Sequence, residues 1–186
     1  MIRLPDYRLP AGTFMGVECQ HSPLALWTLE LVLEDARPKA IVEIGTGSGA
    51  VTLFMAAWAL KRGAQVASFD ILDRFDRERS TVPVMRRLQF EFTVGDCFAP
   101  EIAARIAALA GEEKALLYCD GGNKAKELLT FAPAMQSGGV IGCHDYGTEV
   151  FTGQVDGEME KLGFERYVDP AAMKALYTLQ AWWRKK

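Results

Sequence analysis

Short apolar runs alternate with longer helical segments along most of the chain. The β-rich runs predict seven strands, at residues 40–44, 65–70, 88–94, 115–120, 140–144, 164–168 and 175–183. The segments between them predict helices at about 48–61, 100–110, 124–135 and 155–162, and an apolar segment at 24–33 predicts one more helix before the first strand.

This pattern predicts a doubly wound, Rossmann-like α/β fold built on a mostly parallel seven-stranded sheet. Near-continuous apolar strands are typical of parallel strands that helices cover on both faces. The last two runs are expected to pair antiparallel at one edge. No linker-like stretch or repeat interrupts the pattern, so we predict a single domain over residues 1–186, with a lead-in at 1–36 and an α/β core at 40–186.

Charge and hydropathy exclude several classes of partner. The 186 residues carry a net charge of −3, which argues against a surface that binds nucleic-acid phosphates. The longest uncharged stretch, 44–60, contains three glycines and is shorter than the ~20 apolar residues that cross a bilayer. The N-terminus lacks the apolar region of a signal peptide. We therefore expect no membrane partner and a cytoplasmic location, while a homo-oligomer is compatible with the sequence.

The cysteines and tryptophans are expected to be structural. The four cysteines lie far apart without a CxxC pair, and reduced, buried thiols are the expected state. The tryptophans stand in apolar segments and are expected to pack in the core. They are Trp27, Trp58, Trp182 and Trp183.

A glycine-rich loop follows the first strand of the core. Residues 41–52 read IVEIGTGSGAVT, which places Gly45, Thr46, Gly47, Ser48 and Gly49 between a strand and a helix. Glycines let a ligand approach the backbone closely, and the helix N-terminus offers unpaired N–H groups. The loop therefore predicts a site for a polar ligand.

Glu43 separates the two ligands that such a loop usually binds. GTGSGA also satisfies the GxGxxA pattern of dinucleotide-binding domains, so the loop alone does not decide. A carboxylate two residues before the first glycine would repel a pyrophosphate and attract a sulfonium-bearing amino acid. This favours S-adenosylmethionine (SAM) over a dinucleotide.

The segment EIGTGSG resembles the cofactor loop of class I SAM-dependent methyltransferases. The resemblance implies that Glu43 contacts the methionine end of SAM and that Asp70 binds the ribose hydroxyls. It also implies that Asp96, beside Cys97 in VGDCF, faces the adenine amino group. Because the carboxyl ends of parallel strands meet at one edge of a sheet, these side chains are expected to gather there.

The second half of the chain narrows the resemblance. LLYCDGGNKAKELLTFAPAMQSGGVIGCHDY at 116–146 and GVECQHSPLALW at 16–27 resemble the cephalosporin hydroxylase-like and macrolide sugar O-methyltransferase group. This resemblance implies a small-molecule acceptor and a divalent metal such as Mg²⁺, held by Asp120 and Asp145 after the fourth and fifth strands. Such a cation can bind a diol, lower its pKa and orient its oxygen.

Two positions depart from that group. Asn123 stands where the relatives carry a histidine proposed as base, and His144 replaces one acid of the pair. His144 is a third metal ligand, a general base or a histidine bonded to backbone, and the sequence leaves these alternatives open. Asp120, His144 and Asp145 form the candidate catalytic and metal set, and Asp120 also belongs to the predicted cofactor site. His21 is interpreted as part of a helix-cap neighbourhood and left outside the set.

Three functions compete at this point. The first is a SAM-dependent methyltransferase that acts on a hydroxyl of a small molecule, with or without a divalent metal. The second is an NAD-dependent oxidoreductase that uses the same loop. The third is a non-catalytic SAM-binding or assembly protein, which the departure at Asn123 keeps open.

Overall fold

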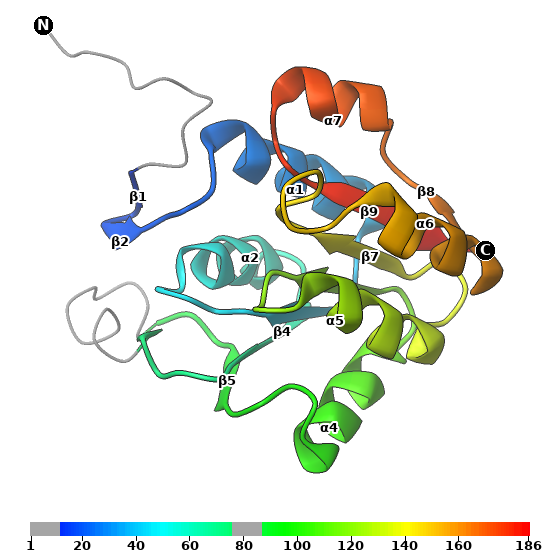
Figure 1. Cartoon of the computed structure of the whole chain (residues 1–186). Helices are drawn as coiled ribbons and strands as arrows, with labels where there is room; N and C mark the ends of the chain where they lie inside the picture. The colour runs from blue at the N-terminus through cyan, green and yellow to red at the C-terminus, as the bar shows by residue number, and fades with distance from the viewer. Residues whose placement is uncertain (1–11, 76–86) are drawn as a thin grey trace, which may run out of the picture.

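A seven-stranded sheet runs through the middle of the computed structural model, which describes residues 12–75 and 87–186 (Figure 1). The chain first forms a small antiparallel hairpin of two strands, β1 (Thr13–Phe14) and β2 (Val17–Glu18). The sheet strands are β3 (Ala40–Ile44), β4 (Gln65–Asp70), β5 (Glu91–Val94), β6 (Ala115–Cys119), β7 (Val140–Cys143), β8 (Phe164–Arg166) and β9 (Ala181–Lys185).

The strand order in the sheet is β5-β4-β3-β6-β7-β9-β8. The five strands from β5 to β7 are parallel to one another, whereas β9 pairs antiparallel with both β7 and β8. The order reverses between β3 and β6, which is the switch point where ligands bind in open α/β sheets. The predicted fold class, including the antiparallel pair at one edge, is confirmed.

Helices cover both faces of the sheet. They are α1 (Pro23–Ala36), α2 (Ala50–Leu60), α4 (Pro100–Ala110), α5 (Lys124–Phe131), α6 (Thr152–Lys161) and α7 (Pro170–Leu176). Successive strand residues point to opposite faces, so Ile41 packs with Leu29 of α1 while Val42 packs with Ile106 of α4. Helices α1, α2 and α7 therefore lie on one face, and α4, α5 and α6 lie on the other.

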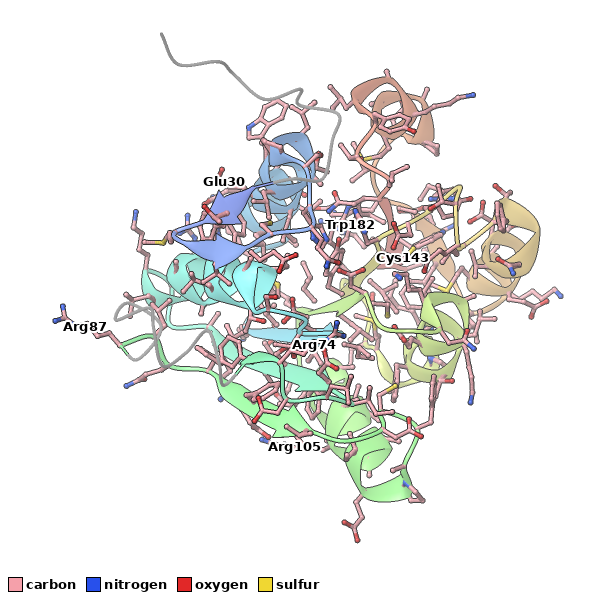
Figure 2. The ribbon with its side chains drawn as sticks, turned by 60° about the vertical axis from the view of Figure 1, so that its left-hand side comes forward. Glu30, Arg74, Arg87, Arg105, Cys143 and Trp182 are labelled. Carbon is pink, nitrogen blue, oxygen red and sulfur yellow. The ribbon has the colours of Figure 1, made fainter. Side chains whose placement is uncertain are left out.

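The sticks in Figure 2 fill the space between these layers. Trp182 and Cys143 lie in the interior, whereas Arg87 and Arg105 extend into solvent. All four cysteines are free, and Cys97 alone among them is only half-buried. Within residues 12–75 and 87–186, no helix is long and apolar enough to span a bilayer.

The two largest differences between the predicted and observed elements lie near the C-terminus and in the middle of the chain. The expected strand at 175–183 begins only at Ala181, because α7 occupies residues up to Leu176. Asp169 caps this helix by accepting a hydrogen bond from the Ala171 N–H at 2.9 Å, and Pro170 suits its first turn. The helix predicted at 124–135 ends at Phe131 and continues as a 3-10 turn over Ala132–Ala134.

The prediction for Trp27 is wrong. Its side chain is 49% exposed, and Leu31, one helical turn later, is 51% exposed. Both lie on the side of α1 that faces away from the sheet. Leu29 and Leu33, on the opposite side of the helix, are buried against the sheet. The other three tryptophans are buried as predicted.

Candidate active site

A cavity of about 1090 Å³ opens at the carboxyl ends of the parallel strands. Five loops that follow β3, β4, β5, β6 and β7 line it, together with two segments from outside the parallel sheet. These lining segments are 44–51, 69–71, 95–98, 120–124 and 144–145, joined by 20–22 and 177–179. The topology therefore gathers residues that lie far apart in the sequence.

The glycine loop forms one wall of this cavity. Gly45, Thr46, Gly47, Ser48 and Gly49 all line it, and Gly49 is the N-cap of α2 with a φ of 92°. Gly45 has a φ of +95°, and a Cβ there would lie 2.2 Å from the backbone oxygen of Asp120. Only glycine fits this conformation and this close approach.

Two acids stand beside the loop. Asp70 accepts hydrogen bonds from the Gly47 N–H at 2.8 Å and the Leu72 N–H at 3.0 Å. Asp96 accepts one from the Phe98 N–H at 2.9 Å, and both acids line the cavity. Each carboxylate thus shapes a turn and still faces the cavity. Cys97 also lines the cavity, and burial raises the pKa of its thiol to about 11.

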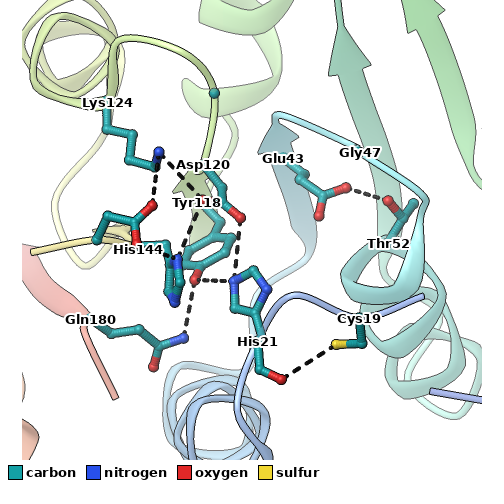
Figure 3. Close-up of polar contacts among 12 residues, drawn as sticks. Cys19, His21, Glu43, Gly47, Thr52, Tyr118, Asp120, Lys124, His144 and Gln180 are labelled. Atoms are coloured by element: carbon teal, nitrogen blue, oxygen red, sulfur yellow. Dashed lines mark hydrogen bonds and ion pairs between the residues drawn. The ribbon is translucent and has the colours of Figure 1, made fainter. Parts of the chain in front are cut away.

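Glu43 lies behind the loop and not in the cavity. Its side chain is fully buried on the face that α2 covers, where Thr52 and Ser68 both donate hydrogen bonds to its Oε2. Figure 3 shows its carboxylate directed at Thr52. Burial raises the pKa of Glu43 to about 8 despite these hydrogen bonds. The predicted direct contact with a cofactor is not what this geometry offers, because the carboxylate supports the loop from beneath.

This position also weakens the charge argument made from the sequence. A group with a pKa of about 8 is mostly neutral at pH 7, so Glu43 does not repel a pyrophosphate as an ionised acid would. The choice between SAM and a dinucleotide must therefore rest on other observations.

A pH dependence of stability follows from Glu43. Its folded pKa of about 8 exceeds the ordinary value of 4.5, so the folded state holds the proton more tightly. The resulting stabilisation is complete below pH 4.5 and is lost as the pH rises through 8. Across this window we expect the free energy of unfolding to fall by up to about 1.4 kcal/mol per pH unit through this group.

The variant Glu43→Gln should remove this component, because a glutamine can still accept from Thr52 and Ser68 but does not titrate. Urea unfolding at several pH values from 5 to 8 measures it as the difference between the two proteins. Glu113→Gln, at an exposed carboxylate, is the matched control and should keep the wild-type slope. Parallel pH profiles for wild type and Glu43→Gln would contradict the assignment.

At the other end of the cavity, two histidines and an aspartate converge (Figure 3). His21 Nε2 lies 3.3 Å from Asp120 Oδ2, and His144 Nδ1 lies 3.7 Å from Asp120 Oδ1. The two imidazole rings are 4.1 Å apart between centroids. The Tyr118 hydroxyl lies 3.1 Å from His21 Nε2 and accepts a hydrogen bond from the Gln180 amide at 3.1 Å.

Burial controls the protonation of this cluster. It lowers the pKa of His21 to about 3, so this imidazole is neutral. It raises the pKa of Asp120 to about 7, against the opposing effect of His144 and Lys124. Asp145 differs, because the hydrogen bond from His144 holds the pKa of this carboxyl well below its usual range.

Lys124 is a buried cation next to the cluster. Its ammonium lies 2.7 Å from Glu149 Oε2, 3.0 Å from Asp145 Oδ2 and 3.8 Å from Asp120 Oδ1. Burial acts to lower the pKa of Lys124, but the hydrogen bond to Glu149 and the charges of Asp120 and Asp145 raise it overall. The lysine therefore stays charged and occupies one side of Asp145.

Asn123 has a structural role. Its side chain caps α5 by accepting from the Lys126 N–H at 3.2 Å. Glu127, buried in the first turn of α5, accepts from the Gly121 and Asn123 N–H groups at 3.1 Å each. These bonds fix the loop that carries Asp120. Asn123 lines the cavity without joining the histidine cluster.

The cluster in the structure differs from the predicted metal set by one residue, with His21 in the place of Asp145. Among the described residues, the group whose ligand atoms all lie within 4.8 Å of one another consists of His21, Asp120 and His144. Asp145 contacts His144 Nδ1 at 3.2 Å but lies outside this group, and Lys124 pairs with it. His21 and Lys124 were missed because each stands at the start of a predicted helix, where a polar residue is common. His21 precedes the N-cap Ser22, and Lys124 begins α5.

Comparison with known proteins identifies the family. The Rhamnosyl O-methyltransferase/CmcI family model matches residues 9–160. The chain belongs to this family. It is 26% identical over 128 residues to a rhamnosyl O-methyltransferase of Mycobacterium leprae (strain TN), over 67% of this chain and 54% of that protein. The chain therefore spans about half the length of this curated relative.

Two CmcI structures share the fold. A structure described as apo has a TM-score of 0.72 at 14% identity, covering 94% of this chain and 76% of that chain. A structure described as a Mg-SAM complex has a TM-score of 0.66 at 14% identity, covering 94% of this chain and 77% of that chain. The family confirms the resemblance drawn from the sequence and favours SAM over a dinucleotide, a choice that Glu43 no longer decides.

Proposed function

We propose that this protein transfers a methyl group from SAM to a hydroxyl of a small-molecule acceptor. One observation carries the proposal: the glycine loop, its two neighbouring acids and the histidine cluster all open into one cavity of about 1090 Å³. Ligand pockets typically hold about 300 to 1,000 Å³. This cavity therefore has room for a nucleoside cofactor and a small acceptor side by side.

The residues divide by their place along the cavity. Gly45, Thr46, Gly47, Ser48 and Gly49 offer backbone groups at the N-terminus of α2 to the amino-acid end of SAM. We propose that the next strand ends bind the nucleoside, with Asp70 at the ribose hydroxyls and Asp96 and Cys97 at the adenine. Glu43 holds the loop in position from beneath. Asp120 stands where the cofactor half of the cavity meets the histidine cluster.

The chemistry at the acceptor end requires alignment and removal of one proton. The acceptor oxygen attacks the methyl carbon, a C–O bond forms and the C–S bond breaks, leaving S-adenosylhomocysteine. The hydroxyl proton must pass to a basic group, for which Asp120, His144 and Asp145 are the candidates. In-line positioning of the two reactants supplies much of the rate enhancement. A divalent cation held at Asp120 and His144 would lower the pKa of the hydroxyl.

Calorimetry with SAM and with S-adenosylhomocysteine tests the cofactor site directly. We expect dissociation constants in the micromolar range, and Asp70→Asn should weaken SAM binding by about 10- to 100-fold, since hydrogen bonds to a charged group contribute ~1.5–3 kcal/mol. The control Glu113→Gln removes an exposed carboxylate and should bind SAM as the wild type does. Failure of SAM to bind would remove the proposal.

Two outcomes would favour the other hypotheses. A thermal shift with NAD and none with SAM would indicate the oxidoreductase. Tight SAM binding without transfer of radiolabelled methyl to any member of a panel of catechols, sugars and other diols would indicate the non-catalytic SAM-binding protein. Transfer to one class of hydroxyl would identify the acceptor chemistry.

A further inference from the structure

We propose that the acceptor end of the cavity binds a first-row transition-metal dication, through His21, Asp120 and His144, in preference to Mg²⁺. The cluster offers two imidazoles and one carboxylate, from three segments far apart in the sequence. Imidazole ligands suit Fe²⁺ and Ni²⁺, with Co²⁺ between them in the order of affinity, whereas Mg²⁺ prefers oxygen ligands. The binding claim stands on these residues alone, and the role of the ion in methyl transfer rests on the proposed function.

The distances in the cluster are close to those between neighbouring ligands of one ion. Two ligands at about 2.1 Å from a metal and 90° to 109° apart are roughly 3.0 to 3.4 Å from each other. His21 Nε2 and Asp120 Oδ2 are 3.3 Å apart, and His144 Nδ1 and Asp120 Oδ1 are 3.7 Å apart. All three ligand atoms lie within 4.8 Å of one another, so binding one ion would require the side chains to move closer together.

The surrounding residues hold the imidazoles in place. Cys19 Sγ donates a hydrogen bond to the His21 carbonyl oxygen at 3.7 Å. Asp145 Oδ1 lies 3.2 Å from His144 Nδ1, and a cation bound at this nitrogen would replace that contact. Tyr118 meets His21 Nε2 through its hydroxyl, and a cation at that nitrogen would replace this one hydrogen bond. Both histidines are buried, with 6% and 8% exposure, so little rotamer freedom remains to be lost on binding.

The carboxylates that would suit Mg²⁺ are engaged elsewhere. The ammonium of Lys124 lies 3.0 Å from Asp145 and 2.7 Å from Glu149, which places a fixed positive charge where a second acidic ligand would be needed. Asp120 is the one carboxylate in the group with the two histidines, and the same ammonium lies 3.8 Å from its Oδ1. A site with a single anionic ligand and a neighbouring ammonium disfavours a strongly hydrated hard cation.

Metal titrations of the S-adenosylhomocysteine-bound protein test this directly. Calorimetry should show Co²⁺ and Ni²⁺ binding at least ~100-fold more tightly than Mg²⁺. The visible absorption of Co²⁺ should change on binding as imidazole enters its coordination shell. His21→Gln should weaken Co²⁺ binding by at least ~10-fold and reduce the spectral change, while the control Glu113→Gln should leave both intact. Because His21 is buried, circular dichroism of His21→Gln must first show the native fold.

His144→Glu provides a second, independent variant. It replaces an imidazole by a carboxylate and should reduce the preference for Co²⁺ over Mg²⁺ by at least ~10-fold. Equal affinity of the wild type for Mg²⁺ and Co²⁺ would overturn the proposal. The absence of any metal binding by protein that binds SAM would also overturn it. Lys124 would then supply the positive charge at the acceptor end of the cavity. Neither result affects SAM binding, so the proposed function is tested separately.

Discussion

Replacing Gly45 by alanine is expected to lower the free energy of unfolding by about 3 kcal/mol or more and to weaken SAM binding at least 100-fold. The loop reaches its position through a φ of +95°, which an alanine adopts only at a cost. The added Cβ would lie 2.2 Å from the Asp120 carbonyl oxygen and 2.6 Å from the Gly121 nitrogen. Both are backbone atoms, so β3 and β6 would have to separate where the glycine loop begins.

Gly63→Ala is the control that separates the cost of backbone strain from the cost of the steric contact with Asp120 and Gly121. Gly63 also has a positive φ, of +67°, but a Cβ there would meet nothing within 4 Å. It lies between α2 and β4, at the edge of the sheet away from the cavity. We expect a cost of about 1 kcal/mol and unchanged SAM affinity. Urea unfolding and calorimetry measure both quantities, and equal losses in the two variants would show that contact with β6 does not determine the loop.

Local pattern was sufficient to predict the sheet and the glycine loop. The strand AIVEI is buried along its whole length, and a sheet covered on both faces requires such a run. The order of strand, glycines and helix then places Gly45 and Gly47 at the carboxyl edge. The elements near the end of the chain were harder to predict, because 175–183 contains Ala, Leu and Tyr, which suit a helix or a strand. In the structure, Asp169 caps a helix that precedes β9.

The role of Glu43 shows what pattern alone misses. The sequence places a carboxylate near the loop but does not say to which side it points. In the structure it points to the same face of the sheet as Ile41, under α2, where Thr52 and Ser68 donate hydrogen bonds to it. The carboxylate therefore became a buried, mostly neutral support. Glu43 contacts residues behind the glycine loop and does not line the cavity.

The histidine cluster could not be assembled from local signals. His21 and Asp120 are separated by nearly 100 positions, and α1 brings them together only by packing on the sheet beside Tyr118. Lys124 follows Asp120 by one helical turn, a spacing that also occurs in ordinary surface ion pairs. The resemblance to the O-methyltransferase group implied Asp120 and Asp145 after two neighbouring strands, with His144 in place of one acid of the pair. Tertiary packing then added His21 and paired Asp145 with Lys124.

Asp120→Asn is expected to lower kcat for methyl transfer by about 100- to 1,000-fold while changing SAM affinity by less than tenfold. The substitution keeps the shape of the side chain but removes the carboxylate that faces His21, His144 and Lys124. An amide nitrogen directed at the neutral His21 or at the lysine ammonium cannot replace the second carboxylate oxygen. The acceptor hydroxyl then loses the group that would orient it or accept its proton, while the glycine loop and Asp70 remain in place.

The control residue for Asp120→Asn lies at the other end of the same strand, β6. Glu113→Gln removes the same charge just before the start of β6, at the opposite edge of the sheet, and should leave kcat and SAM affinity unchanged. Lys124 keeps Asp145 and Glu149 as partners in Asp120→Asn, so the fold should persist and the melting temperature should fall only slightly. A fall in SAM affinity that matches the fall in kcat would place Asp120 in the cofactor site alone. Wild-type turnover would remove it from the reaction altogether, and the proton would then have to leave through His144 or Asp145.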